Sequence, residues 1–216
     1  MLGAWFFNGL ATLGLVLGLA LAPAAPAAAK NPIHILAFGD SLTAGYGLPT
    51  DEAFPTRLQA ALRAKGIDAV VDNAGVSGDT TAGGLARLDW TLSGSKARLA
   101  IVELGANDGL RGLDPAETRK NLDAILTRLK AAGVRVLLTG MMAPPNLGRD
   151  YGREFNAIFP DLAAKHRVAF YPFFLDGVAA NPALNQGDGL HPNAEGVDII
   201  VRRILPDVTR LVSDDG

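Results

Sequence analysis

Three residues of types that act together in nucleophilic catalysis occur in glycine-rich segments of the chain. Ser41 lies in AFGDSLTAGYG (37–47), just after a short apolar run, and His191 lies in GDGLHPN (187–193), three residues after Asp188. A serine hydroxyl is a weak nucleophile until a base takes its proton, and histidine is the usual base because its pKa lies near neutrality. Asp188 could accept the second imidazole N–H and fix the tautomer. The three residues are therefore a candidate triad, if the fold brings them together.

Each residue also has a plain structural interpretation. Ser41 and Asp188 both stand beside glycine, where serine and aspartate form turns for local reasons. The other two histidines fit the role of base less well. His34 lies inside an expected strand, before the serine, and His166 lies near a helix end, where a surface role is expected.

Acyl transfer at a serine also needs hydrogen-bond donors for the developing oxyanion. The segments VSGDTT (76–81) and GAND (105–108) offer two, the backbone N–H of Gly78 and the side-chain amide of Asn107. The backbone N–H of Ser41 would be a third. The alternatives are a turn glycine at 78 and a helix cap or Asx turn at 107.

The elements that must position these residues alternate between strands and helices. Apolar runs predict strands at 33–38, 68–75, within 97–108, at 134–141 and at 168–174. Helical periodicity predicts helices at 54–65, 82–92, 115–132, 153–166 and 193–211. This order indicates a three-layer α/β/α domain with a five-stranded, mostly parallel sheet. Ligands bind beyond the carboxyl ends of such strands, and all four glycine-rich segments follow strands.

The four segments resemble the blocks of the SGNH (GDSL) hydrolase superfamily. FGDSLTAGYG resembles its first block, NAGVSGDTT its second, VELGANDGL its third and DGLHPN its fifth, in the same order across nearly all of residues 33–211. VSGDTT…GLARL and ELGANDGLRG are especially similar to the bacterial thioesterase/arylesterase/lysophospholipase branch. The resemblance implies a flavodoxin-like sheet, Ser41 as nucleophile, His191 as base oriented by Asp188, and an oxyanion hole from Ser41, Gly78 and Asn107.

The same resemblance implies hydrolysis of small-molecule acyl esters or thioesters without metal or cofactor. Two alternatives stay open. A carbohydrate acetyl esterase would use the same triad on another substrate, and a non-catalytic binding domain could share the fold. The second would most easily have lost Ser41, Asn107 or His191, and all three are present.

Polar residues near these segments fit supporting roles. Glu103 interrupts an apolar run, where a carboxylate must be hydrogen-bonded to be tolerated. We expect Asp40, Asp79 and Asp108 to hold loops through side-chain bonds to backbone. Arg111 could meet an anionic head group or be a solvated loop residue, and the segment 141–152 could wall an acyl groove or simply connect two elements.

The composition fits one globular domain and argues against nucleic acid as a partner. The 216 residues are 49% hydrophobic and 19% charged, with a formal charge of −2, so no basic face for nucleic acid is expected. The absence of cysteine excludes thiol catalysis and disulfides. We expect residues 30–216 to form a single, monomeric domain.

The first 29 residues carry no charged side chain and end in Ala27-Ala28-Ala29 before Lys30. An apolar stretch followed by a small-residue site indicates a cleaved signal peptide, which predicts a periplasmic or secreted bacterial protein without stable membrane insertion. The alternative is an uncleaved membrane anchor, because about 18 apolar residues nearly span a bilayer.

Overall fold

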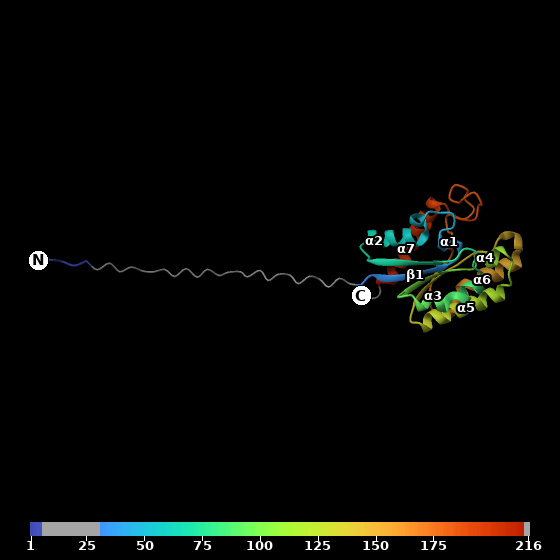
Figure 1. Ribbon diagram of the computed structural model, residues 1–216, viewed down its shortest axis with the longest axis horizontal. Helices are drawn as coiled ribbons and strands as arrows, with labels where there is room; N and C mark the ends of the chain where they lie inside the picture. The colour runs from blue at the N-terminus through green and yellow to red at the C-terminus, as the bar shows by residue number, and fades with distance from the viewer. Residues whose placement is uncertain (6–30, 214–216) are drawn as a thin grey trace. The chain divides into compact units, whose positions relative to one another are not determined.

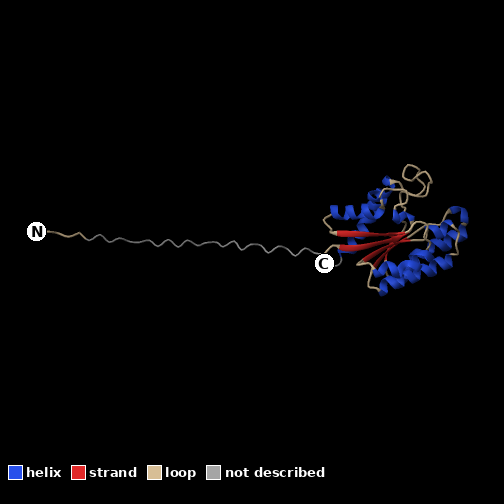
Figure 2. Ribbon diagram, viewed as in Figure 1, coloured by secondary structure: helices blue, strands red, loops and turns tan. Residues whose placement is uncertain are grey.

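The computed structural model describes residues 1–5 and 31–213. Residues 6–29 of the expected signal peptide lie outside the described residues. From Asn31 onward the chain forms one compact unit, in which helices pack on a central sheet (Figure 2). Within the described residues, no helix is both long and apolar enough to cross a membrane.

All strands of the sheet are parallel. The alternation of strands and helices in the sequence predicted a mostly parallel sheet. Within the described residues the strands are β1 (Ile33–Gly39), β2 (Ala69–Gly75), β3 (Leu99–Glu103), β4 (Arg135–Thr139) and β5 (Ala169–Tyr171). Their order across the sheet is β2-β1-β3-β4-β5, which is the flavodoxin-like order. The last residues of three strands stand side by side, because Gly39 pairs with Gly75 on one side and with Glu103 on the other. The loops that follow β1, β2 and β3 therefore start next to one another at the same edge of the sheet.

Helices cover both faces of the sheet (Figure 1). The long helices are α2 (Phe54–Ala64), α3 (Thr81–Ser93), α5 (Pro115–Ala131), α6 (Arg149–His166) and α7 (Ala194–Ser213). The pair α2 and α7 packs together on one face, while α3, α5 and α6 lie on the other. All five residues of β3 are buried, as expected for a central strand covered on both sides.

Among the described residues, four short helical segments were not expected from the sequence. They are α1 (Ser41–Ala44), η1 (Thr50–Glu52), α4 (Ala106–Leu110) and η2 (Pro145–Leu147). None is long enough for a periodic apolar stripe, which is the signal that finds helices in sequence. The remaining differences lie at element ends, where β4 and β5 are shorter than expected and α6 starts four residues earlier.

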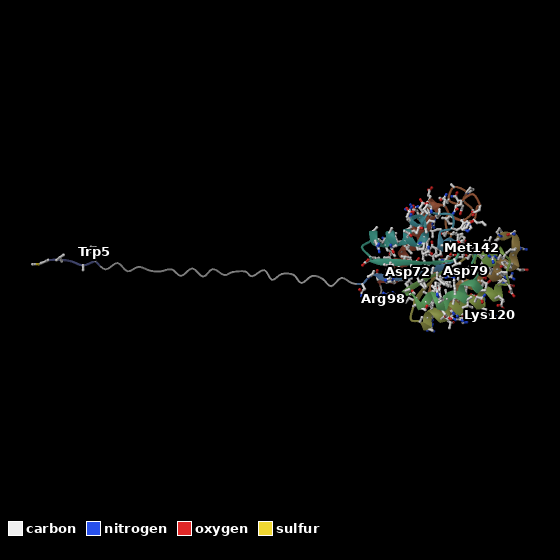
Figure 3. The ribbon with its side chains drawn as sticks, viewed as in Figure 1. Trp5, Asp72, Asp79, Arg98, Lys120 and Met142 are labelled. Atoms are coloured by element: carbon white, nitrogen blue, oxygen red, sulfur yellow. The ribbon has the colours of Figure 1, made fainter. Side chains whose placement is uncertain are left out.

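The strand ends and the segments that follow them lie at one edge of the sheet. Figure 3 labels Asp79, from the loop after β2, and Met142, from the segment after β4, and both lie toward the carboxyl ends of the strands. Arg98, which immediately precedes β3, lies toward the opposite ends. The expectation that the glycine-rich segments share one edge is therefore confirmed for the three segments that directly follow β1, β2 and β3.

Candidate active site

Ser41 is the first residue of α1 and is separated from the end of β1 by Asp40 alone. The Asp40 carboxylate caps this short helix, with Oδ1 accepting a hydrogen bond from the Leu42 N–H at 3.0 Å. The chain can turn this sharply because Gly39 has no side chain, and a Cβ there would collide with the Thr43 hydroxyl and Glu103. As the first helical residue, Ser41 keeps a backbone N–H that no helical carbonyl can accept.

His191 and Asp188 meet Ser41 in one hydrogen-bonded series. His191 Nε2 lies 2.9 Å from Ser41 Oγ, and His191 Nδ1 lies 2.6 Å from Asp188 Oδ2. With the ring proton on Nδ1, Nε2 presents its lone pair to the serine hydroxyl. The structure thus brings together residues 150 positions apart in the chain.

Local hydrogen bonds keep the Asp188 carboxylate ionised. Its Oδ1 accepts from the backbone N–H groups of His191 at 3.0 Å and Leu190 at 2.9 Å. These two bonds, followed by the bond from the imidazole, lower the pKa of Asp188 to about 2. An ionised carboxylate on Nδ1 favours a positive charge on the imidazole when it takes a proton from Ser41.

A hydrogen-bonded link holds the histidine loop against the serine loop. Gln186 donates through Nε2 to the carbonyl of Tyr46 at 2.7 Å and to that of Pro192 at 2.9 Å. The Tyr46 ring lies against the His191 ring, with centroids 4.6 Å apart. The roles of Tyr46 and Gln186 could not be predicted from the sequence, because no local signal pairs positions so far apart.

Gly78 lies in the loop after β2, in a left-handed conformation that favours glycine. Its φ is +84°, a region that residues with a Cβ rarely adopt. Arg111 Nη2 donates to the Gly78 carbonyl at 2.9 Å. Arg111 therefore joins the loop after β2 to the end of α4, a role that the sequence analysis did not foresee.

Asn107 lies in α4 and reaches the residue before Ser41. Its side-chain Nδ2 donates to Asp40 Oδ2 at 3.0 Å. An amide nitrogen carries two N–H donors, so this bond uses one of them and leaves the other. Asn107 is thus neither a cap nor an Asx turn alone, because its side chain bonds across the strand ends.

Two buried acids lie beneath α1. Asp40 and Glu103 are both fully buried, and Glu103 Oε2 accepts from the Thr43 hydroxyl at 2.8 Å and the Asp40 N–H at 3.4 Å. Burial raises the pKa of Asp40 to about 6, and burial together with the charge of Asp40 raises the pKa of Glu103 well above its usual range. Burial therefore favours the neutral form of these acids, more strongly for Glu103 than for Asp40. The expected hydrogen-bonded support from Glu103 is found.

The other two acids near the site hold loops in different ways. Asp108 accepts from the Thr81 N–H at 2.9 Å and the Thr118 hydroxyl at 3.1 Å, which ties α4 to α3 and α5. Asp79 forms an ion pair with Arg87 Nε at 2.6 Å in place of the expected bond to backbone. Among the residues that the structure describes, no group of three His, Asp or Glu side chains could hold a metal ion.

The remaining histidines lie apart from Ser41, and one expectation about them is wrong. His34 Nδ1 lies 3.3 Å from Asp72 Oδ2, in the strand where it was expected. The surface role expected for His166 is wrong, because its side chain is only 9% exposed and its Nε2 lies 2.6 Å from Asp123 Oδ1. The partner that holds His166 is a carboxylate on the neighbouring helix α5. The position of His166 near a helix end does not predict a partner on another helix.

The segment 141–152 packs against the end of α4 and the turn after it. A Cβ at Gly109 would lie 3.4 Å from Pro144 Cδ, and Tyr151 Oη donates to the Leu113 carbonyl at 2.8 Å. Met142 and Leu110 nevertheless keep about half of their surface exposed. The acyl groove expected at this segment stays a prediction.

Hydrogen bonds from a serine through an imidazole to a carboxylate are the arrangement of serine hydrolases, here on a doubly wound α/β sheet. The chain belongs to the GDSL-like Lipase/Acylhydrolase family, which matches residues 37–199.

Its relatives carry the names of ester hydrolases. The chain is 40% identical over 178 residues to Esterase TesA of Pseudomonas aeruginosa, covering 82% of this chain and 89% of that protein. It is 41% identical over 189 residues to thioesterase 1/protease 1/lysophospholipase L1 of Escherichia coli, covering 88% of each. The crystal structure of AlinE4, an SGNH-hydrolase family esterase, superposes with a TM-score of 0.72 at 51% identity, covering 84% of this chain and 97% of that one. The family, the fold class and the class of ester hydrolase expected from the sequence are confirmed.

Proposed function

We propose that this chain hydrolyses acyl esters and thioesters with Ser41 as nucleophile, His191 as general base and Asp188 as the group that orients His191. The observation that carries the proposal is the 2.9 Å separation between His191 Nε2 and Ser41 Oγ. This distance allows direct proton transfer, which is the geometric requirement on a base. The pairing of Nδ1 with Asp188 supports the tautomer that such a transfer needs.

In the first half-reaction Ser41 Oγ attacks the carbonyl carbon of the ester while its proton passes to His191 Nε2. The carbonyl π bond breaks and the oxygen becomes an oxyanion. The tetrahedral intermediate then collapses, the bond to the leaving oxygen or sulfur breaks, and His191 gives its proton to that atom. An acyl group stays on Ser41 Oγ.

In the second half-reaction His191 takes a proton from water, and the resulting hydroxide equivalent attacks the acyl-serine carbonyl. Collapse of this intermediate breaks the bond to Ser41 Oγ, which regains its proton from His191. The acid leaves and the enzyme is regenerated. The steps need neither metal nor cofactor.

We assign the oxyanion hole to the Ser41 N–H, the Gly78 N–H and the free amide N–H of Asn107. Ser41 starts a helix and so has an unused backbone donor, and the left-handed φ of Gly78 supports an exposed N–H in the neighbouring loop. Asn107 is held beside Asp40. Donors of this kind are usually the largest single contribution to catalysis of acyl transfer.

The substrate class rests on the relatives and on exposed apolar side chains near α4. The relatives' names include esterase and thioesterase. Leu110, Leu113 and Met142 are exposed although they are apolar, and the segments that carry them pack together. Such a surface suits an acyl chain better than a sugar ring, so we favour acyl esters and thioesters over acetylated carbohydrate.

We further propose that residues 1–29 are a signal peptide that is removed on export, and that residues 30–216 act as a monomeric domain in the periplasm or outside the cell. The supporting observation is the uncharged apolar stretch with its small-residue end. Sequencing the amino terminus of the protein from its native host tests this directly. A mature protein that begins at Met1 would overturn it.

The function is tested by steady-state hydrolysis of an acyl series, from acetyl to palmitoyl, as p-nitrophenyl esters and as thioesters, with an acetylated glycan alongside. We expect turnover of esters and thioesters, a preference for chains longer than acetyl, and none of this activity in Ser41→Ala. Activity that survives Ser41→Ala would overturn the triad. Preference for the glycan would select the carbohydrate esterase, and binding without turnover of any substrate would select the binding domain.

A further inference from the structure

The Asp40 carboxylate bonds to the nucleophile's helix and to the candidate oxyanion hole at once. Its Oδ1 accepts from the Leu42 N–H at 3.0 Å and its Oδ2 accepts from Asn107 Nδ2 at 3.0 Å. The side chain is fully buried, so water does not compete for either bond. One rigid carboxylate therefore sets the position of two elements, α1 and α4, relative to each other.

The bond to Asp40 also decides which way the Asn107 amide points. An ionised carboxylate only accepts hydrogen bonds, whereas an asparagine amide has a donor end and an acceptor end of nearly the same shape. Asp40 can therefore pair with the nitrogen end of the amide and not with its oxygen. The second N–H is then left for the oxyanion, and the amide oxygen is kept from turning toward a negative charge.

Glu103 holds Asp40 in place from below. Its Oε2 accepts from the Asp40 N–H at 3.4 Å and from the Thr43 hydroxyl at 2.8 Å. Its Oε1 is buried and has no hydrogen-bond partner among the described residues. Burial, followed by the charge of Asp40, raises the pKa of Glu103 well above its usual range, because a neutral acid tolerates burial better than a carboxylate.

We propose that Asp40 is a positioning residue that fixes the Asn107 amide with its N–H toward the oxyanion, in addition to capping the helix of the nucleophile. The inference rests on the proposed function, because Asn107 must be an oxyanion donor for its orientation to matter. Asp40 touches no reacting atom, and its effect on turnover passes through Asn107.

A double-mutant cycle between Asp40→Ser and Asn107→Ala tests the inference. Serine is a good helix cap, so Asp40→Ser keeps a bond to the Leu42 N–H but is too short to reach Asn107 as well. We expect kcat to fall about 10- to 100-fold with KM nearly unchanged, because a transition-state interaction is weakened. In the Asn107→Ala background the same substitution should lower kcat by less than about threefold, because the residue through which it acts is gone.

Thr43→Val is the matched control. It removes a buried hydroxyl from the same helix and the same hydrogen-bond network, but it has no bond to Asn107. Its effect on kcat should be equal in the two backgrounds. Asp40→Asn repeats the test if Asp40→Ser does not fold, because Leu42 and Asn107 donate to different oxygens of Asp40, and asparagine replaces one of these oxygens with an NH2 group that cannot accept.

The outcomes separate the inference from the function on which it depends. The inference would be overturned if Asp40→Ser lowered kcat equally in the wild-type and Asn107→Ala backgrounds, or if it did not change kcat. In either case the proposed function would stand as long as Ser41→Ala abolishes turnover. Wild-type turnover in Ser41→Ala would instead overturn the proposed function. A loss expressed in KM alone would also contradict the inference, since it would indicate weaker substrate binding without loss of oxyanion stabilisation.

Discussion

Each of the three histidines lies beside an aspartate, yet the three pairs do different things. His191–Asp188 and His166–Asp123 have the same separation of 2.6 Å, and His34–Asp72 is longer at 3.3 Å. His166 and Asp123 join α6 to α5, where Lys165 Nζ also contacts Asp123 at 2.7 Å. What separates His191 is its second nitrogen, which faces Ser41 Oγ.

A histidine–aspartate contact is therefore not evidence of catalysis by itself. The carboxylate orients an imidazole in all three pairs, and the partner of the other ring nitrogen decides what the imidazole can do. A lysine beside Asp123 further shares its charge and ties the pair into a structural ion cluster. If catalysis depends on the serine partner and not on the contact with aspartate, substitutions in the three pairs should have unequal effects on turnover.

The largest difference in kcat should appear between variants that remove the imidazole of His191 and the imidazole of His166. We expect His191→Ala to lower kcat by about 10⁴- to 10⁶-fold, because no other base can take the Ser41 proton. His166→Ala should leave kcat within about twofold but lower the free energy of unfolding by about 1–3 kcal/mol, since it leaves a buried space and removes one of the two cationic partners of Asp123. Steady-state kinetics and urea unfolding of both variants measure this. Equal losses of kcat would contradict the distinction.

The aspartates should differ in the same direction, with a smaller effect. We expect Asp188→Asn to lower kcat by about 10²- to 10⁴-fold, because an amide can hold the imidazole in the wrong tautomer. Asp123→Asn is the matched substitution and should change kcat by no more than about twofold. A large effect of Asp123→Asn on turnover would indicate that helices α5 and α6 influence the site.

Acid pH should affect the two aspartates alike, although only one serves catalysis. Both pKa values lie below the ordinary 3.8, that of Asp188 at about 2 and that of Asp123 lowered first by Lys165 and then by His166. A group with a lowered native pKa binds fewer protons when folded, so its stabilisation is present above pH 3.8 and is lost as pH falls toward the native pKa. Urea unfolding at neutral pH and near pH 3 should therefore show a smaller acid loss in Asp188→Asn and in Asp123→Asn than in the wild type. An unchanged acid loss would contradict the ionic character of the pairs.

The smallest effect should come from His34. The pair with Asp72 is longer and both side chains are partly exposed, and pairs of this kind contribute less than about 1 kcal/mol. We expect His34→Ala to leave kcat unchanged and to shift unfolding by no more than that amount. If His34→Ala lowered the free energy of unfolding as much as His166→Ala, the contribution of these pairs to stability would not depend on their exposure.

The fold could be predicted from the sequence because its elements carry strong local signals. Apolar runs identified the strands, and the predicted helix at 115–132 is found from Pro115, where Asp114 Oδ1 caps it by accepting from the Ala116 N–H at 2.9 Å. The short helices at Ser41 and Ala106 could not be predicted in this way. Caps, strand ends and side chains distant in sequence stabilise them, and these contacts exist only after the sheet has formed.

The candidate site likewise contains residues that the sequence predicts and contacts that it does not. The chain order of the glycine-rich segments pointed to Ser41, Asp188 and His191, because parallel strands place their carboxyl ends at one edge. The bond from Asn107 to Asp40, the bond from Arg111 to Gly78 and the burial of His166 were not predictable. Each depends on a partner between 33 and 67 residues away, and no local pattern specifies such a partner.

The most direct test of the central claim is covalent labelling with a fluorophosphonate, followed by intact-mass and peptide mass spectrometry. Attack by an activated serine on phosphorus expels fluoride and leaves one phosphonyl group on the enzyme. We predict a single adduct on Ser41, none in Ser41→Ala, and greatly slowed labelling in His191→Ala but not in His166→Ala. An adduct on another residue, or equal labelling rates in the two histidine variants, would contradict the claim that His191 activates Ser41.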